Sequence, residues 1–249
     1  MLNLLESKIK QAEMSMREHI NSSLVLGTVS SGTFIANTST GGAYGLNPLG
    51  YFLRKLNATD PTTQNVGNIS GASYDWWRHH TGYVNNQTVT GQDFKLNIST
   101  YAGLQSALKR MYNFCSRGSG GSPDLVIADQ VSFETYENAL DTKVRYTNTK
   151  MADMGFDTIK LRGATMIWDE LVPDIYTGTA AITVGSAFFI NSSFYKLIID
   201  SQTDIITTPF VEPENQTAKT AKILFMGQAG VSNLRKHGVV GGISQSIAA

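Results

Sequence analysis

Apolar residues recur at steps of three and four along the first 25 positions of the chain, with charged residues between them. This spacing is that of a helix with one apolar face. It predicts an α-helix from Leu2 to about residue 26, roughly 35 Å long at 1.5 Å per residue, with Gly27 placed to end it. The apolar stripe consists of Leu5, Ile9, Ala12, Met16, Ile20 and Leu24.

Residues 28–99 show little periodicity and are rich in Gly, Ser, Thr and Asn. The pairs Asn47-Pro48 and Asp60-Pro61 are typical of turns. We therefore expect loops with short strands in this region, held to the rest of the protein by apolar side chains. The expected anchors are Leu46, Leu49, Tyr51, Phe52, Leu53, Tyr74, Trp76 and Trp77.

A clearer pattern begins at Thr100. A second amphipathic helix is predicted to run to about Phe114, and a Gly-rich turn over 116–124 follows it. The apolar run at 124–129 predicts a buried strand, and Ser132 is placed as the N-cap of a third helix. This order of elements indicates a layered unit of helices on a sheet. The apolar face of the second helix consists of Tyr101, Leu104, Leu108, Met111 and Tyr112.

The last hundred residues are predicted to be mostly strand. Segments 180–191, 194–201 and 218–243 are apolar or alternating, and 206–218 is an extended stretch marked by proline. Residues 156–170 alternate between apolar and polar positions, which is typical of a half-buried strand. The apolar positions of that segment are Ile159, Leu161, Ala164, Met166 and Trp168.

The charge content narrows the class of protein. Only 16% of the 249 residues are charged and the formal net charge is zero. A low-charge surface suggests that partners cover much of it, and a neutral chain lacks the overall field of a nucleic-acid binder. No apolar run approaches the roughly 18 residues of a membrane span, and no signal peptide is present. We expect a protein made in the cytoplasm, with Cys115 reduced.

No pattern of candidate residues predicts an active, cofactor or metal site. His79 and His80 are adjacent, so they point in different directions and make a poor metal clamp. Cys115 ends a predicted helix and is interpreted as a small core residue, because a reactive thiolate would need a nearby histidine. The Gly-rich turn lacks the Lys-Ser/Thr pair of a phosphate-binding loop.

Two further groups of residues are also interpreted structurally. The carboxylates Asp124, Asp129, Glu134 and Glu137 have no spacing that makes them a site. The Trp76-Trp77-Arg78 run is a possible stacking platform for bases or sugars, but the better interpretation is an anchor for the loops or a subunit contact. We therefore expect no catalytic residues, no cofactor and no metal, and a protein that is not an enzyme.

Four blocks, in order along the chain, resemble the major capsid proteins of tailed bacteriophages. The helix LLESKIKQAEMSMREHIN is similar to their long spine helix, and Arg78 follows a tryptophan pair as it does in that family. The third block is SPDLVIADQVSFETYENAL with VRYTNTKMADMGFDTIKLRGATMIWDE, and the fourth is PFVEPENQTAKTAKILFMGQ.

The resemblance implies an α+β protein with the Hong Kong 97-type phage capsid fold. Such a chain has a peripheral domain, made of a long spine helix and extended strands, and an axial domain with a central sheet flanked by helices. We expect residues 1–35 and 207–249 in the peripheral domain and 36–206 in the axial domain. The family also has an N-terminal arm and an extended loop before the spine helix, which this sequence lacks. A truncation, an alternative start and a divergent member are the three explanations left open.

The implied function is a coat protein that self-assembles into hexamers and pentamers of an icosahedral phage head enclosing double-stranded DNA. The implied partners are other copies of the chain, with scaffold, portal and decoration proteins, and packaged DNA bound without sequence specificity; no membrane is expected. The implied location is the virion. Two alternatives stay open: an encapsulin-like compartment shell, and a monomeric carbohydrate-binding or adhesion module.

Overall fold

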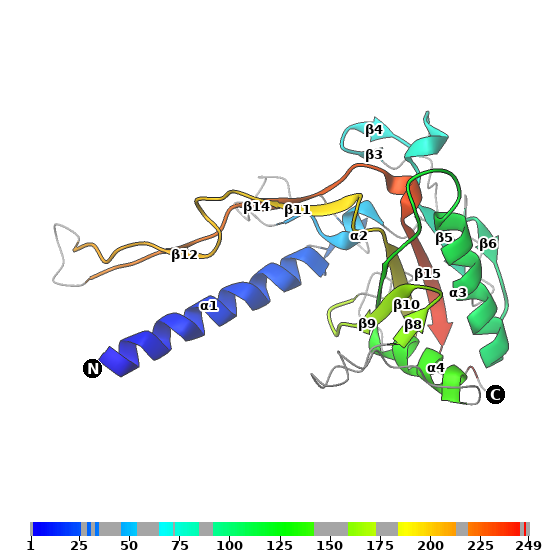
Figure 1. Cartoon of the computed structure of the whole chain (residues 1–249), viewed down its shortest axis with the longest axis horizontal. Coiled ribbons are helices and arrows are strands. Elements are labelled where there is room, and N and C mark those ends of the chain that lie inside the picture. Colours follow the sequence, from blue (N-terminus) through cyan, green and yellow to red (C-terminus); the bar gives the residue numbers. More distant parts are fainter. Residues whose placement is uncertain are drawn as a thin grey trace.

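The computed structural model describes residues 2–25, 29–30, 33–34, 46–53, 65–71, 73–84, 92–141, 159–172, 184–212, 219–244 and 247. A body built around one sheet lies at one end of the molecule. A long helix and a narrow ribbon of strands both project from this body in the same general direction (Figure 1). Helices and sheets are thus both present, and the expectation of an α+β protein is confirmed.

The body is organised by a mixed sheet of seven strands. The central strand β10 is antiparallel to both of its neighbours, β15 and β7, whereas β15 is parallel to β5, and β7 is parallel to β9. In spatial order the strands are β6 (Phe94–Lys95), β5 (His80–Tyr83), β15 (Gly238–Ser244), β10 (Val184–Ile190), β7 (Leu125–Ala128), β9 (Ala164–Trp168) and β8 (Ile159–Leu161).

Two helices, α3 (Tyr101–Cys115) and α4 (Gln130–Asp141), cover one face of this sheet. The predicted second helix is confirmed, and its residues Leu104, Leu108 and Met111 are fully buried. The Thr100 side chain accepts a hydrogen bond from the backbone N–H of Gly103 and so caps the helix.

The start of the third helix differs from the prediction. Helix α4 begins at Gln130, two residues before Ser132. The Asp129 carboxylate accepts the backbone N–H of Ser132 at 3.1 Å, so Asp129 occupies the capping position. The same oxygen accepts the N–H of Ser186 in β10, also at 3.1 Å. One carboxylate therefore joins the helix to the central strand.

The other face of the sheet is covered by smaller elements. These are α2 (Leu49–Phe52), the 3-10 turns η2 (Asp75–Trp77) and η3 (Leu234–Lys236), and the last turn of α1. Side chains of β10 alternate between the two cores: Ala187 and Phe189 face the helices, and Phe188 and Ile190 face α2 and the turns. The central strand is therefore buried on both faces.

Helix α1 (Leu2–Val25) confirms the first prediction. At 1.5 Å per residue its 24 residues span about 36 Å. Within the described residues, the contacts that tie it to the body lie at its end: Val25 is buried, the Asn21 amide donates to Asp169, and the Ser23 hydroxyl accepts the N–H of Leu46. The residue expected to end the helix, Gly27, lies outside the described residues.

The projecting ribbon, here called the arm, covers residues 195–231. Strand β11 (Tyr195–Ile199) pairs antiparallel with β14 (Gly227–Val231), and β12 (Ile206–Thr207) pairs with β13 (Ile223–Leu224). Two short hairpins complete the described strands: β1 (Val29–Ser30) with β2 (Thr33–Phe34), and β3 (Asn65–Val66) with β4 (Ile69–Ser70).

Three expectations from the sequence are wrong in detail. Tyr74 and Trp76 are exposed rather than anchors, although Leu46, Leu49, Phe52, Leu53 and Trp77 are buried as expected. Trp168, the last residue of β9, is 53% exposed. The segment 156–170 holds two strands, since Arg162 and Gly163 both have positive φ and turn the chain between β8 and β9.

The fully buried Leu108 provides a test of the core under α3. Leu108→Ala should lower the free energy of unfolding by about 3 kcal/mol, because the buried side chain is lost and a cavity remains. The exposed Ser106 on the same helix is the control, and Ser106→Ala should change this free energy by less than about 0.5 kcal/mol. Urea denaturation measures both, and equal effects of the two variants would contradict the packing described.

Candidate assembly interface

The arm exposes an unusual number of large apolar side chains for so small an element. Ile198 and Met226 are 66% and 64% exposed, and residues 196–199 of β11 are exposed on both faces of the strand. A two-stranded ribbon is at best marginally stable in water on its own, and contiguous exposed apolar surface marks an interaction site. The exposed apolar residues of the arm are Leu197, Ile198, Ile199, Ile206, Phe210, Val211, Leu224 and Met226.

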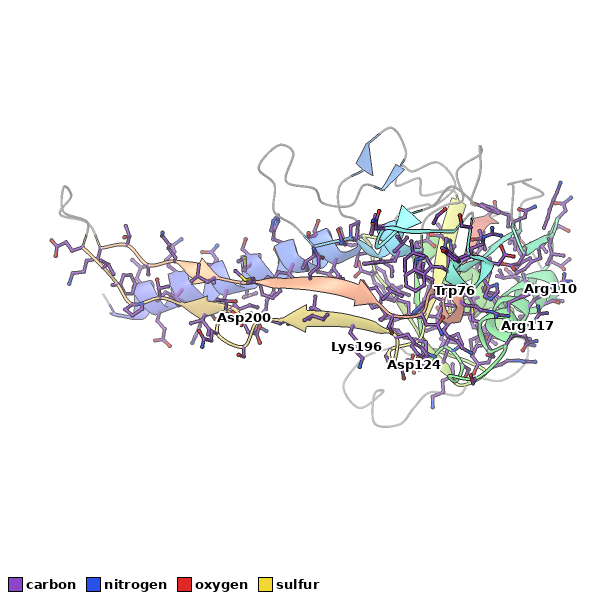
Figure 2. The ribbon with its side chains drawn as sticks, turned by 90° about the horizontal axis from the view of Figure 1, so that it is seen from above. Trp76, Arg110, Arg117, Asp124, Lys196 and Asp200 are labelled. Atoms are coloured by element: carbon purple, nitrogen blue, oxygen red, sulfur yellow. The ribbon has the colours of Figure 1, made fainter. Side chains whose placement is uncertain are left out.

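Helix α1 presents a second such surface. Leu4 and Met14 are exposed, and Ile9, Met16 and Ile20 of the predicted apolar stripe are only half-buried. The described ion pair on the helix, Lys10 with Glu6 at 3.1 Å, is exposed at both ends and contributes little to stability. The helix and the arm project together (Figures 1 and 2), so these surfaces lie on the same extended part of the molecule.

Both strands of the arm join the sheet at one place, here called the arm root, which consists of residues 191–194 and 232–237. Strand β10 ends at Ile190 and β11 begins at Tyr195, while β14 ends at Val231 and β15 begins at Gly238. The backbone N–H of Ser232 donates to the carbonyl of Phe194 at 3.0 Å and joins the two halves of the root. The root therefore connects the arm to the sheet, and the Asn47 N–H, which donates to the Gln228 side chain, adds a further contact between body and arm.

A buried lysine holds the root to the Gly-rich turn after α3. Lys236 is 2% exposed, and its ammonium group donates to the carbonyl oxygens of Arg117, Gly118 and Gly121 at 2.9, 3.3 and 3.2 Å. A buried charge is tolerated only when its hydrogen bonds are satisfied, and these three match the three donors of an ammonium group. Gly118 and Gly121 have positive φ, which lets the turn wrap around the ammonium group.

Asn191 makes the second attachment of the root to the same turn. Its side-chain amide donates to the carbonyl oxygens of Gly120 and Ser122, and its carbonyl oxygen accepts the N–H of Ser193. Next to it, Asp124 accepts hydrogen bonds from both the backbone N–H and the hydroxyl of Ser192. Burial opposes ionisation of Asp124, but these donors hold the pKa of its carboxyl below its ordinary value.

His237 links the arm root to the sheet through two hydrogen bonds. Its Nδ1 accepts the backbone N–H of Asn191 at 3.2 Å, and its carbonyl oxygen accepts the N–H of His80. Burial and the neighbouring His79 lower the pKa of His237 to about 4, with Asp124 opposing them. The imidazole is therefore neutral at pH 7, as its role as a hydrogen-bond acceptor requires.

The residues singled out in the sequence do not come together in one place. His79 is buried beside the root, while His80 contacts Asp93 at 3.0 Å, so the two histidines have separate surroundings. Asp124 lies at the root and Asp129 caps α4, whereas Glu134 accepts a hydrogen bond from Gln130. Within the described residues, no group of three or more His, Cys, Asp or Glu could hold a metal ion.

Cys115 and the tryptophan run have structural surroundings. Cys115 is fully buried with its sulfur 3.8 Å from that of Met111, and burial raises the pKa of its thiol, so its interpretation as a core residue is confirmed. Trp77 is buried and donates its indole N–H to the carbonyl of Val66, whereas Trp76 is 54% exposed. No helix in the described part of the chain is long and apolar enough to cross a membrane.

The arm root is not predicted by the sequence. The Gly-rich turn was interpreted only as a link to β7, and no local signal pairs it with a lysine more than a hundred positions later. The one available clue was an Asn-Ser-Ser run at 191–193 directly after an apolar strand, which is typical of a chain that leaves a sheet through side-chain hydrogen bonds.

Replacement of Lys236 tests the root. Lys236→Met should lower the free energy of unfolding by about 2–3 kcal/mol, because the three hydrogen bonds of a buried charged donor are lost and the partly buried carbonyls of the turn are left without it. Hydrogen exchange of the β11 and β14 amides should also accelerate. The exposed arm residue Lys196 is the control, and Lys196→Met should change neither quantity. Unchanged exchange in Lys236→Met would contradict the anchoring role of this side chain.

The low pKa of His237 predicts a pH dependence. Between the unfolded value of 6.5 and the folded value of about 4, the unfolded chain binds a proton that the folded protein excludes. Stability from this group is therefore complete above pH 6.5 and decreases as the pH falls toward 4, with a slope of up to about 1.4 kcal/mol per pH unit. Urea unfolding at several pH values measures it. His237→Gln should remove this part of the slope, and an unaltered slope would refute the assignment.

Similarity to known proteins is found in the fold and not in the sequence. No protein-family model matches the chain, and no curated protein matches it in sequence. The fold is similar to that of a chain in the solved structure "Cyanophage A-1(L) capsid asymmetric unit", with a TM-score of 0.53 and 14% sequence identity. The match covers 97% of this chain and 69% of that chain. This protein therefore shares its α+β fold with a chain from a phage capsid.

Proposed function

We propose that this chain is a major capsid protein of a tailed phage, with the Hong Kong 97-type fold. In this proposal it self-assembles into the hexamers and pentamers of an icosahedral head that encloses double-stranded DNA. It is not an enzyme and works in the virion, where scaffold, portal and decoration proteins are its further partners. The observation that carries the proposal is the exposed apolar arm beside an exposed long helix, in a fold shared with a capsid chain.

The arm supports self-association for a physical reason. Within the described residues, β11 and β14 pair as strands only with each other, so neither has a second strand along its outer edge. Free edges and exposed apolar side chains are the two features that favour addition of another chain. A closed shell supplies such a chain to every subunit, because its head-to-tail contacts repeat until the rotation closes.

The strand pairing also supports a modified domain division within the proposal. The expected peripheral segment 207–249 includes β15, but β15 lies in the central sheet between β5 and β10. Conversely β11, expected in the axial domain, pairs with β14 in the arm. We propose a peripheral domain made of α1 and the arm, and an axial domain made of the sheet with α2, α3 and α4.

The two alternatives make different predictions. An encapsulin-like shell would form similar particles, but they would hold protein cargo instead of DNA. A monomeric carbohydrate-binding module is favoured by one observation, the exposed pair of Tyr74 and Trp76, whose ring centroids lie 5.6 Å apart. Such a pair would suit stacking against a sugar ring. The carbohydrate-binding hypothesis also requires that the protein stay monomeric.

Light scattering after gel filtration, with negative-stain electron microscopy, tests the proposal. The purified chain should form rings or shells, and the fraction of protein in them should increase with protein concentration. Ile198→Asp should shift the protein toward monomer, because it places a charge on the arm's apolar surface, and Ile198→Val at the same site should assemble as the wild type does. Neither change should alter the free energy of unfolding by more than about 0.5 kcal/mol, since Ile198 is exposed. A wild-type chain that remains monomeric at all concentrations would overturn the proposal.

A further inference from the structure

The exposed side of α3 and its surroundings carries a cluster of cations, here called the α3 basic patch and defined as Lys109, Arg110, Arg117 and Arg162. Lys109 and Arg110 are exposed residues of α3, and Arg117 follows the helix, two residues after its end at Cys115. Arg162, in the turn between β8 and β9, reaches the same side by donating to the Asn113 carbonyl oxygen. All four residues are exposed.

Two of these arginines are held by aromatic rings. The Arg110 guanidinium lies 5.7 Å from the centre of the Phe94 ring, and that of Arg117 lies 4.1 Å from the centre of the Phe114 ring. The two rings are stacked on each other with centroids 6.1 Å apart and planes 18° apart. Stacking on a ring positions a guanidinium group while leaving its N–H donors available to a ligand.

No described carboxylate forms a salt bridge with a residue of the patch. The salt bridges of the described residues join Lys10 with Glu6, Arg78 with Asp75 and His80 with Asp93, and none includes a patch residue. The acidic residues Glu134 and Glu137 lie instead on α4. Charge is thus separated between the two helices that cover the sheet, although the chain as a whole is neutral. Overall neutrality therefore does not prevent local binding of a polyanion.

The chemistry of the patch fits phosphate. Arginines bind phosphate oxygens through paired N–H donors, and a row of separate cations follows a line of regularly spaced charges. The patch has no element shaped to read base edges, so any binding would be through the backbone and independent of sequence. Figure 2 shows Arg110 and Arg117 close together at the end of the body opposite the arm, away from the proposed assembly surface.

We propose that the α3 basic patch binds the phosphate backbone of duplex DNA without sequence preference. The inference deepens the proposed function and rests on it, because it identifies the face of the subunit that is turned toward packaged DNA. Arg110 and Arg117 make the direct contacts, and the Phe94–Phe114 stack positions them.

Fluorescence anisotropy of a short labelled duplex of random sequence, titrated with the full chain at several salt concentrations, tests the patch. Arg110→Gln with Arg117→Gln should weaken binding at least about tenfold and reduce the slope of log K against log salt by about 2, one for each lost phosphate contact. Lys8→Gln with Lys10→Gln on α1 removes the same charge elsewhere and should leave both quantities unchanged. Arg110→Lys with Arg117→Lys should restore most of the slope.

Several outcomes would overturn the inference. These are absence of binding by the wild type at low salt, equal losses in the α3 and α1 variants, and tighter competition by polyglutamate than by unlabelled DNA, which would indicate an acidic protein partner. The assembly state is measured separately by light scattering. Shells that form without DNA binding would refute this inference alone, whereas a strict monomer that binds DNA through the patch would refute the proposed function alone.

Discussion

The attachment of the arm root to the Gly-rich turn is the contact on which the extended shape depends. The Lys236 ammonium group is enclosed by three backbone carbonyls of the turn, and the Asn191 amide binds two more. Asn191 precedes β11 and Lys236 follows β14, so the two halves of the arm root are both fixed to one loop of the body. Because burial of an unsatisfied charge is costly, Lys236 favours a single arrangement of the root over a set of loosely related ones.

The central strand β10 connects this root to the rest of the fold. Its side chains alternate between the two cores, and its last residue precedes Asn191 directly. At its other end, Ser186 shares the Asp129 carboxylate with the first turn of α4. The direction of the arm is thereby linked through one buried strand to the packing of both layers. Such linkage suits a subunit that has to hold an extended element at a fixed angle.

Local patterns predicted the helices well and the long-range contacts poorly. Helices α1 and α3 were predicted nearly to the residue because their apolar spacing is contained within the segment itself. The place of β15 in the sheet could not be read from its own residues, since its neighbour β5 lies more than 150 positions earlier. Ser132 was expected as the cap of α4, but Asp129 occupies that position and also accepts the N–H of Ser186 in β10, a contact between residues distant in the sequence. The burial of Lys236 could not be predicted for the same reason, because its hydrogen-bond partners lie more than a hundred positions earlier in the chain.

The arm leaves the body and returns to it at one point, so it is a single excursion of the chain between two adjacent strands of the sheet. Residues can therefore be gained or lost within it without moving any strand of the body out of register. The body can thus keep its packing while the arm changes in length and sequence. A lineage of such subunits could vary how each one reaches its neighbours while keeping the same folded core.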